Sequence, residues 1–457
     1  MDTKALRQKI LDLAIHGKLV PQDPNDEPAS VLLERIRAEK ERLIKEGKIK
    51  KGKKSAKTSD KPHYPYELPK GWVWCKLDDI AYVASGSTPE KSSFVPKGIP
   101  YIKMYNLRNQ KIDFEYKPQY ITAEIHNGKL QRSRTEVGDL IMNIVGPPLG
   151  KLAIIPPSLP QANFNQAAVL IRPYLHKDNI NVYLKAYLEE MSEINSISTK
   201  GSAGQVNISL TQSQNMRIPL PPLPEIERII KNLKYWLSFV DNIEENKEKL
   251  QNSIRQVKSK VLDLAIHGKL VPQDPNDESA IELLKRINPK AEITCDTPQY
   301  GKLPKGWCLC KISSVVDIVN GKSQKNVESP TGKYPIYGSG GIIGKAMEYT
   351  CLAGSSIIGR KGTINHPIFV EENFWNVDTA FGMKANNQIL EDKYFYCFCL
   401  YFDFSKLDKS SALPSLTKTA IGNLILPIPP LAEQQRIVAK IEELFSQLDK
   451  IESSLQA

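Results

Sequence analysis

The segment LDLAIHGKLVPQDPNDE occurs at residues 11–27 and again, without a single change, at residues 262–278. Looser agreement continues beyond it, because LLERI at residues 32–36 corresponds to LLKRI at residues 283–287. An identity of this length within one chain marks an internal duplication, which decides the architecture before any single residue is considered.

Two further pairs of segments extend the duplication. LPKGW occurs at residues 68–72 and 303–307, and IPLPPLPEIERI at residues 218–229 corresponds to LPIPPLAEQQRI at residues 426–437. The same blocks therefore follow one another in the same order twice.

The two ends of the chain complete the pattern. By the spacing of these segments, the last residue corresponds to Lys249 and the first to Asn252, so the start resumes almost where the end leaves off. The middle of the chain thus holds one long element whose twin is divided between the termini. We expect the N-terminal and C-terminal helices to meet and together mimic the central one, which gives the monomer a pseudo-two-fold axis.

The central element has the spacing of a coiled-coil strand. Apolar residues recur there mostly in alternating steps of four and three, at Ile226, Ile230, Leu233, Leu237, Val240, Ile243, Leu250, Ile254, Val257, Val261 and Leu264. The C-terminal copy keeps this spacing at Ile437, Ile441, Leu444, Leu448, Ile451 and Leu455. About 40 residues at 1.5 Å each predict a helix roughly 60 Å long. The alternative, two ordinary core helices, fits less well because polar side chains fill the other faces.

Between the helices lie two β-rich blocks, in which short apolar segments alternate with Gly, Pro, Asn and Ser turns. The predicted fold class is α+β, with the two blocks joined by a long antiparallel coiled coil whose second strand is assembled from both termini. The predicted divisions are an N-terminal helical region (1–36), a basic linker (37–63), a first block (64–218), a central helical region (219–287), a linker (288–299), a second block (300–426) and a C-terminal helix (427–457).

The formal net charge of the 457-residue chain is +11, which favours polyanionic partners. Residues 37–61 hold eleven Lys or Arg and four acidic residues, which leaves +4 for everything else. We interpret this run as a solvated linker, with a phosphate-binding arm as the alternative.

Other features exclude whole classes of protein. Pro, Gly or a charge interrupts every apolar run, so none is long enough to span a membrane. The N-terminus lacks the apolar stretch of a signal peptide, so we expect a cytoplasmic protein. Seven Cys residues are too few for a disulfide framework and are expected to be reduced thiols.

Together these features resemble the specificity subunit of a type I restriction-modification system. The resemblance rests on AIHGKLVPQDPNDE, the GW entries of both blocks, the PLPPLPE and PIPPLAEQ exits and the divided coiled coil, and it covers essentially the whole chain. It implies that each block is a target recognition domain that reads one half of a bipartite, asymmetric site in double-stranded DNA. It also implies helices that fix the spacer and dock two modification (methyltransferase) subunits, with restriction subunits joining through the complex. The subunit itself would not be an enzyme.

No catalytic motif contradicts this expectation. An amino-methyltransferase needs an Asn- or Asp-Pro-Pro-aromatic loop, and the nearest string, GPPL at residues 146–149, has neither the polar group nor the ring. The glycine-rich residues 338–344 miss the GxGxxG spacing and are interpreted as a turn, which the resemblance to the family's YPxYG loop makes DNA-facing.

Metal binding is not expected either. Cys308 with Cys310 and Cys397 with Cys399 form C-x-C pairs, whereas structural zinc sites prefer C-x₂₋₄-C. His16 occupies an equivalent repeat position to His267, where a cap of a helix C-terminus is the expected role. We therefore expect no catalytic residues, no cofactor and no metal.

The residues predicted to touch DNA are polar or basic residues in turns, since base edges and phosphates require hydrogen-bond donors and acceptors. In the first block they are Ser87, Thr88, Lys91, Lys103, Asn106, Asn143, Lys151, Lys200 and Gln205. In the second block they are Ser323, Gln324, Lys325, Tyr337, Gly338, Ser339, Gly340, Gly341, Arg360, Lys361, Ser410, Ser411 and Lys418. The alternative for each is an ordinary polar turn residue.

The sequence is also compatible with a second function. The chain could be a coiled-coil scaffold or regulatory protein whose β-rich blocks bind proteins. Competition by plain duplex DNA as effective as by a cognate site would favour that alternative.

Overall fold

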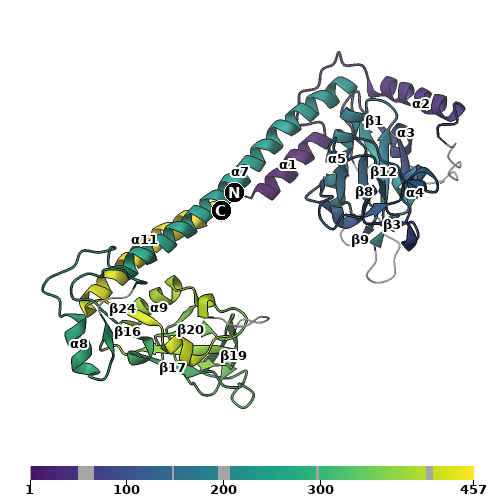
Figure 1. The fold of residues 1–457 in the computed structure, drawn as a ribbon. Coiled ribbons are helices and arrows are strands. Elements are labelled where there is room, and N and C mark those ends of the chain that lie inside the picture. The colour runs from purple at the N-terminus through teal and green to yellow at the C-terminus, as the bar shows by residue number, and fades with distance from the viewer. Residues whose placement is uncertain are drawn as a thin grey trace. The chain divides into compact units, whose positions relative to one another are not determined.

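The computed structural model describes residues 2–49, 66–146, 149–193, 206–294, 298–407 and 415–456. They divide into two compact units, here named the N-terminal unit (Asp2–Glu245) and the C-terminal unit (Asn246–Ala457). Helix α7 (Leu223–Ile266) has 44 residues and passes from the first unit into the second (Figure 1). The predicted mixture of helices and strands is confirmed.

The N-terminal unit has helices at both ends and strands between them (Figure 1). Besides the first part of α7, its α-helices are α1 (Thr3–Ile15), α2 (Ala29–Lys45), α3 (Leu77–Ile80), α4 (Ala123–Asn127), α5 (Lys177–Glu193) and α6 (Leu210–Gln214). Its strands are β1 (Val73–Lys76), β2 (Ala81–Ser85), β3 (Phe94–Val95), β4 (Ile99–Ile102), β5 (Leu107–Arg108), β6 (Lys111–Ile112), β7 (Tyr120–Ile121), β8 (Leu140–Asn143), β9 (Val145–Gly146), β10 (Leu152–Ile154), β11 (Asn163–Phe164), β12 (Ala168–Pro173), β13 (Val206–Asn207) and β14 (Arg217–Leu220).

The C-terminal unit has the same plan. After the end of α7, its α-helices are α8 (Ala280–Ile287), α9 (Asp392–Tyr401), α10 (Lys418–Gly422) and α11 (Leu431–Gln456). Its strands are β15 (Ile293–Thr294), β16 (Cys308–Lys311), β17 (Val316–Asn320), β18 (Tyr334–Gly338), β19 (Gly341–Ala346), β20 (Ser355–Gly359), β21 (Ile368–Val370), β22 (Trp375–Asn376), β23 (Ala380–Ala385) and β24 (Ile425–Ile428).

Each unit holds one β-rich module, here named the first module (residues 66–220) and the second module (residues 298–428). Both contain a four-stranded antiparallel sheet with corresponding strand orders, β10-β8-β12-β2 and β21-β20-β23-β17. Beside it, β4 pairs with β11 and β18 pairs with β22, both in parallel. The two modules are therefore copies of one fold, although their sequences differ strongly.

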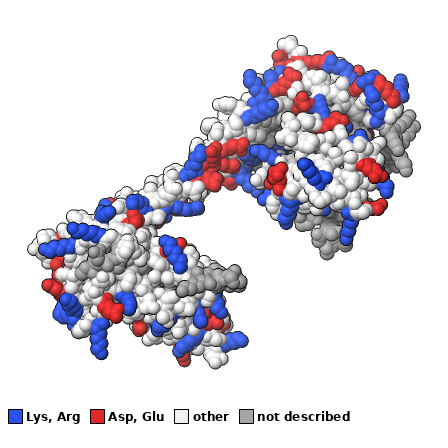
Figure 2. All heavy atoms as spheres, in the orientation of Figure 1, with Lys and Arg blue, Asp and Glu red and all other residues white. Residues whose placement is uncertain are grey.

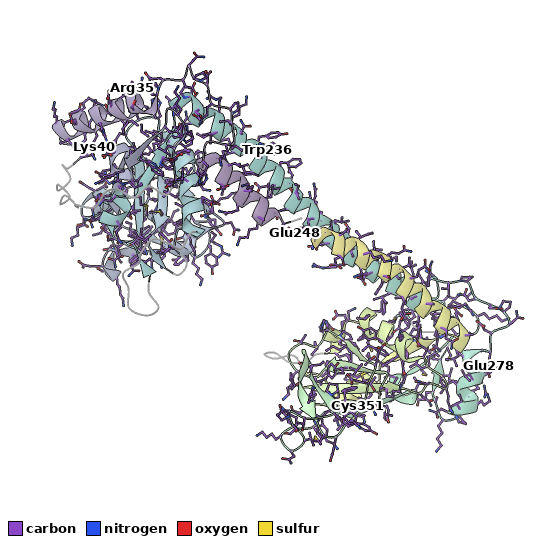
Figure 3. All side chains as sticks on the ribbon, turned by 180° about the vertical axis from the view of Figure 1, so that it is seen from behind. Arg35, Lys40, Trp236, Glu248, Glu278 and Cys351 are labelled. Carbon is purple, nitrogen blue, oxygen red and sulfur yellow. The ribbon has the colours of Figure 1, made fainter. Side chains whose placement is uncertain are left out.

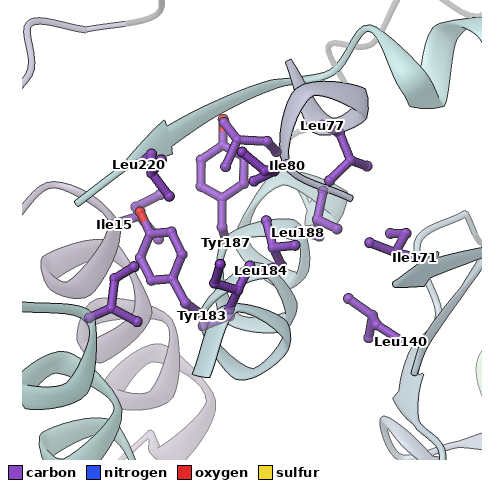
Figure 4. Packing of buried hydrophobic residues seen from close by; sticks show 14 of the residues in the cluster. Ile15, Leu77, Ile80, Leu140, Ile171, Tyr183, Leu184, Tyr187, Leu188 and Leu220 are labelled. Carbon is purple, nitrogen blue, oxygen red and sulfur yellow. The ribbon is translucent and has the colours of Figure 1, made fainter. Parts of the chain in front are cut away.

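The core of the N-terminal unit lies on both sides of α5. Tyr183, Leu184, Tyr187 and Leu188 of this helix are buried between Ile15 and Leu220 on one side and the sheet residues Leu140 and Ile171 on the other (Figure 4). The hydroxyl of Tyr183 donates to the carbonyl of Pro219, and that of Tyr394 on α9 makes the same bond to Pro427. The module is thus attached to the strand that leads into the long helix in both copies.

The repeated HGKLVPQDPNDE segment is held by a glycine at its start. Gly17 and Gly268 have φ of +64° and +66°, a conformation that other residues adopt only with strain. A Cβ on Gly17 would lie 2.6 Å from Cγ of Pro69, and one on Gly268 would overlap Pro304. The loop therefore packs against LPKGW because it carries no side chain at this point.

A buried glutamate joins LPKGW to the start of each long helix. The indole Nε1 of Trp72 donates to Oε2 of Glu225 at 2.9 Å, and that of Trp307 donates to Oε2 of Glu433 at 3.0 Å. Both glutamates lie in the first turn of their helix and are almost fully buried. Gln273, from the second HGKLVPQDPNDE copy, donates to the other oxygen of Glu433 at 3.1 Å. One carboxylate thus connects three segments.

Ion pairs repeat at corresponding positions along the helices. Arg228 binds Asp26 at 2.6 Å, and Arg436 binds Asp277 at the same distance. Arg7 pairs with Asp241 and Glu244, as Lys258 does with Asp449 and Glu452. Along each pair of segments the residue numbers rise on one side as they fall on the other, because Arg7 lies opposite Asp241 whereas Asp26 lies opposite Arg228. Helices α1 and α11 therefore each run antiparallel to the part of α7 in their own unit.

Three details differ from the sequence-based expectation. Helix α2 continues to Lys45, past the expected start of the basic linker, and Lys40 binds Asp78 of α3 at 2.6 Å. Strand β15 lies in the expected linker 288–299 and pairs with β16. Leu250, Val257 and Ile451, which belong to the predicted coiled-coil positions, are exposed. Apolar spacing identifies one face of a helix but not which part of that face another helix covers. Most of the basic linker, from residue 50, lies outside the described residues.

Substitution of Glu433 tests the buried carboxylate. Burial raises the pKa of Glu433, so the folded chain retains a proton that the unfolded chain loses as the pH rises. This glutamate therefore costs stability above the unfolded pKa of about 4.3, and increasingly so as the pH passes through its raised folded value. An amide keeps one acceptor oxygen for the two donors, so Glu433→Gln loses one hydrogen bond while it removes a buried charge. We expect the calorimetric unfolding midpoint of this variant, relative to that of the unaltered chain, to be more favourable at pH 8 than near pH 4.

Glu433→Ala is the matched control. It leaves the Trp307 indole and the Gln273 amide without their acceptor, and each buried unpaired donor costs about 1–3 kcal/mol. The midpoint should fall at both pH values. A Glu433→Gln protein that loses more stability at pH 8 than at pH 4 contradicts this account.

Candidate nucleic-acid interface

In the second module, three segments meet at the turn Asn376–Ala380. Strand β18 pairs with β22, which leads into the turn. Lys322 N donates to the carbonyl of Asn376 at 2.8 Å, and Arg360 N donates to that of Thr379 at 2.7 Å. A Cβ on Gly321 would overlap the Val377 carbonyl, so this approach requires glycine. The turn therefore brings together loop 321–325, the β18–β19 hairpin and residues 360–361.

Most predicted site residues of the second module lie on these segments with accessible side chains or backbone. Those exposed are Ser323, Lys325, Gly340, Lys361 and Lys418; those partly exposed are Gln324, Tyr337, Ser339, Gly341 and Arg360, whereas Gly338 is buried. Lys361 forms a β-bridge with Ser415, which brings the segment before α10 to the same region. Ser410 and Ser411 lie outside the described residues.

Two of these side chains are held by aromatic rings. The guanidinium of Arg360 lies 5.9 Å from the centre of the Phe381 ring. Tyr337 packs edge-to-face on Phe374, and burial raises the pKa of its hydroxyl further above the physiological range. Both residues therefore present donors from fixed positions.

The first module builds the corresponding loop on the corresponding strand. Ser87 N donates to the carbonyl of Phe164 in β11 at 3.1 Å, and a Cβ on Gly86 would overlap the Asn165 carbonyl. The hydroxyl of Ser87 accepts from Arg132 at 2.9 Å, so it orients an exposed guanidinium that sequence reasoning missed. Thr88 and Lys91 are exposed in the same loop.

Two predicted contact residues have other tasks. Asn106 is fully buried: its Oδ1 accepts from Lys103 N at 2.9 Å, and its Nδ2 donates to the Asp113 and Tyr116 carbonyls. Asn143 is also buried, where it donates to the Val145 carbonyl and accepts from Lys151 N. Since these amides are committed to backbone groups, we assign both residues to loop positioning and remove them from the contact set.

The loop that Asn106 shapes carries cations. Arg108 and Lys111 flank the tight turn of the β5–β6 hairpin, where Asn109 and Gln110 have positive φ. The exposed guanidinium of Arg108 lies 4.1 Å from the centre of the Tyr116 ring. Sequence reasoning missed this pair, although the Asn-Gln turn between two cations was a readable signal. Lys103 and Lys151 are partly exposed, whereas Lys200 and Gln205 lie outside the described residues.

Charge is spread over both modules. Figure 2 shows Lys and Arg side chains interspersed with Asp and Glu on the visible face of each, instead of one continuous basic surface. This distribution suits short contacts from several loops better than a single electrostatic groove.

The four cysteines of the C-x-C pairs and His16 have structural positions. Cys308 and Cys310 are buried on β16, and burial raises the pKa of Cys310 to about 12. Cys397 and Cys399 are buried on α9. His16 caps α1 as predicted, with Nδ1 2.8 Å from the Asp12 carbonyl.

The described residues contain no group of three or more His, Cys, Asp and Glu side chains placed to hold a metal ion. No helix among them combines the length and apolarity that crossing a membrane requires.

Comparison with known proteins gives consistent matches. The family model described as type I restriction modification DNA specificity domain matches residues 69–252 and 304–457. The EcoAI specificity subunit of Escherichia coli is 26% identical over 98% of this chain and 90% of its own length, and the EcoEI subunit is 27% identical over 99% and 91%. A chain from a solved structure of a type I R-M system superposes with a TM-score of 0.57 at 18% identity, covering 86% of this chain and 94% of its own. Since the family model covers well over half of the sequence and both modules, the chain belongs to the type I restriction-modification DNA specificity family.

Proposed function

We propose that this protein is the DNA-reading specificity subunit of a type I restriction-modification complex in the cytoplasm, and that each module reads one half of a bipartite, asymmetric site. One observation carries the proposal: the same buried frame occurs twice and holds two modules of one fold with different loops. Two equivalent helical frames suit two modules that both read DNA. The different loops of the modules suit half-sites of different sequence.

The difference between the loops is chemical. After β4, the first module presents the cations Arg108 and Lys111, whereas the hairpin after β18 presents Ser339, Gly340 and Gly341. Guanidinium and amide groups can form paired hydrogen bonds with base edges, whereas glycines let backbone N–H groups approach closely. The two half-sites should therefore differ in sequence.

The proposed contact set follows from exposure. In the first module it comprises Ser87, Thr88, Lys91, Lys103, Lys151, Arg108, Lys111 and Arg132, and Lys200 and Gln205 remain sequence-based candidates. In the second it comprises Ser323, Gln324, Lys325, Tyr337, Ser339, Gly340, Gly341, Arg360, Lys361 and Lys418, whereas the buried Gly338 is left out. Ser410 and Ser411 remain sequence-based candidates. Ser87 acts there through Arg132.

The helices are proposed as the assembly frame. α1 and α11 would form the divided second strand of a coiled coil with α7, giving the pseudo-two-fold axis and the spacer between half-sites. Repeated ion pairs such as Arg7–Asp241 and Lys258–Asp449 support equivalent pairing within each unit. Two modification subunits would dock on this frame and supply the methyl transfer, with restriction subunits joining through the complex.

A groove of about 380 Å³ between α1 and α7 is the proposed docking surface in the N-terminal unit. Its walls are Leu6, Lys9, Ile10, Leu13, Lys18 and Leu19 on one side and Trp236, Phe239 and Val240 on the other. Trp236 is 42% exposed and Phe239 is 52% exposed. Figure 3 shows the Trp236 side chain on α7. Exposed aromatic side chains that are rimmed by cations suit an apolar, acidic partner helix.

The other unit repeats part of this lining. At the positions equivalent to Lys9, Leu13 and Lys18, the duplication places Lys260, Leu264 and Lys269. Leu444 and Gln447 stand where Trp236 and Phe239 stand in the N-terminal unit. The retained residues support docking of two copies of one partner.

Reconstitution tests the function and the docking surface together. With labelled S-adenosylmethionine and cognate DNA, the chain alone should transfer no methyl groups, and the chain with its modification subunits should transfer them. Trp236→Ala with Phe239→Ala should weaken binding of a modification subunit about tenfold or more, because two large apolar contacts are lost. Methyl transfer by the isolated chain would overturn the non-catalytic assignment.

Leu250→Ala is the control for docking. Leu250 is 40% exposed on the same helix but does not line the groove, so its loss should leave assembly unchanged. Equal effects of both substitutions would contradict the groove as the docking surface. Competition by plain duplex DNA as strong as by the cognate site would favour a protein-binding scaffold instead.

Substitution of Arg108 tests DNA contact by the first module. Arg108→Gln should weaken cognate binding by about 1–3 kcal/mol, since a well-placed Arg contributes this much at a base or phosphate. Electrophoretic mobility shifts at fixed salt measure the change. Arg35→Gln removes an exposed arginine on α2, paired with Glu27, and should change binding little. Unaltered affinity of the Arg108 variant would remove this hairpin from the interface.

A further inference from the structure

The tip of the β18–β19 hairpin carries two uncovered apolar side chains. Ile342 and Ile343 are 63% and 55% exposed. Neither side chain is therefore covered by the rest of the module.

The base of the same hairpin is firmly held. Ile336 on β18 and Ala346 on β19 are fully buried, and β18 also pairs with β22. The pairs Ile336–Gly344 and Tyr337–Ile342 leave Ile343 as an extra residue on β19, so the exposed part begins at a bulge. The ribbon is also narrow, because Gly338, Gly341 and Gly344 carry no side chains. An anchored, narrow ribbon suits insertion into a groove.

The charge of the hairpin indicates what it enters. Residues 333–347 contain no acidic residue, and Lys333 and Lys345 are exposed. A polyanion is therefore the complementary partner. The major groove of B-DNA is wide enough for a two-stranded β-ribbon, and the methyl group of thymine is the apolar feature on its base edges.

We propose that Ile342 and Ile343 enter the major groove at the second half-site and recognise thymine through its 5-methyl group. The proposal rests on the function given above and adds base-reading residues to it. At the corresponding place, the first module has Arg108 and Lys111. Recognition of a methyl group by apolar side chains is therefore proposed for the second half-site alone.

Replacement of thymine by deoxyuridine in the cognate duplex tests the proposal, because it removes only the methyl group. With the complex of chain and modification subunits, each contacted thymine should lose about fourfold in affinity on replacement. Ile342→Ala with Ile343→Ala should weaken binding to the thymine duplex and make the complex indifferent to the replacement. The uridine measurement uses the unaltered protein, so it does not depend on how the variant folds.

Leu352→Ala is the matched control, because Leu352 is 52% exposed in the same module but lies beyond the hairpin. It should leave both the affinity and the uridine effect unchanged. A second half-site without thymine, or a uridine effect that persists in the double variant, overturns the proposal. The proposal is also overturned if the double variant no longer assembles with the modification subunits but keeps its DNA preference, because the apolar patch would then bind a protein subunit. A complex without any sequence preference instead refutes the proposed function.

Discussion

A buried glutamate that accepts an indole N–H holds each half of this protein together. Glu225 and Glu433 lie in the first turn of a long helix, and Trp72 and Trp307 come from the segment that enters each module. A buried carboxylate is costly unless it is hydrogen-bonded, so this contact favours the arrangement in which helix, entry segment and repeated loop are all in place. The orientation of each module relative to its own helix start depends on it.

This constraint explains how two modules can diverge without losing their common scaffold. The contacts that attach a module to its helix involve Gly17 or Gly268, the Trp–Glu pair and the Tyr183 or Tyr394 hydroxyl, all at the helix side. The loops proposed to read DNA surround the turn that follows β11 in the first module and β22 in the second module. Since the two sets are separate, substitutions in the loops need not disturb the frame. A protein whose recognition changes while its assembly persists requires this separation.

Much of the frame could be predicted from the sequence because duplication repeats residues as well as spacing. The order of elements, the long helix and the helix caps followed from identical segments and periodic apolar residues. Burial along α7 did not follow, since Leu250 and Val257 share the predicted face with covered residues and yet are exposed.

The contact residues were harder to predict. Asn106 looked like a recognition residue because a polar residue after a strand has the same sequence signal whether its amide faces solvent or closes its own loop. Arg132 depends on Ser87, 45 residues away, and only the fold brings them together. Ile342 and Ile343 resemble core residues in sequence, and only the exposure of both identifies them as surface residues.

The most direct test of two readers in one repeated frame is the methylation map of DNA modified by the chain with its modification subunits. Single-molecule sequencing should reveal one motif with two specified, unlike halves separated by a fixed number of unspecified bases. A continuous motif, two identical halves, or half-motifs at variable spacing would contradict the account.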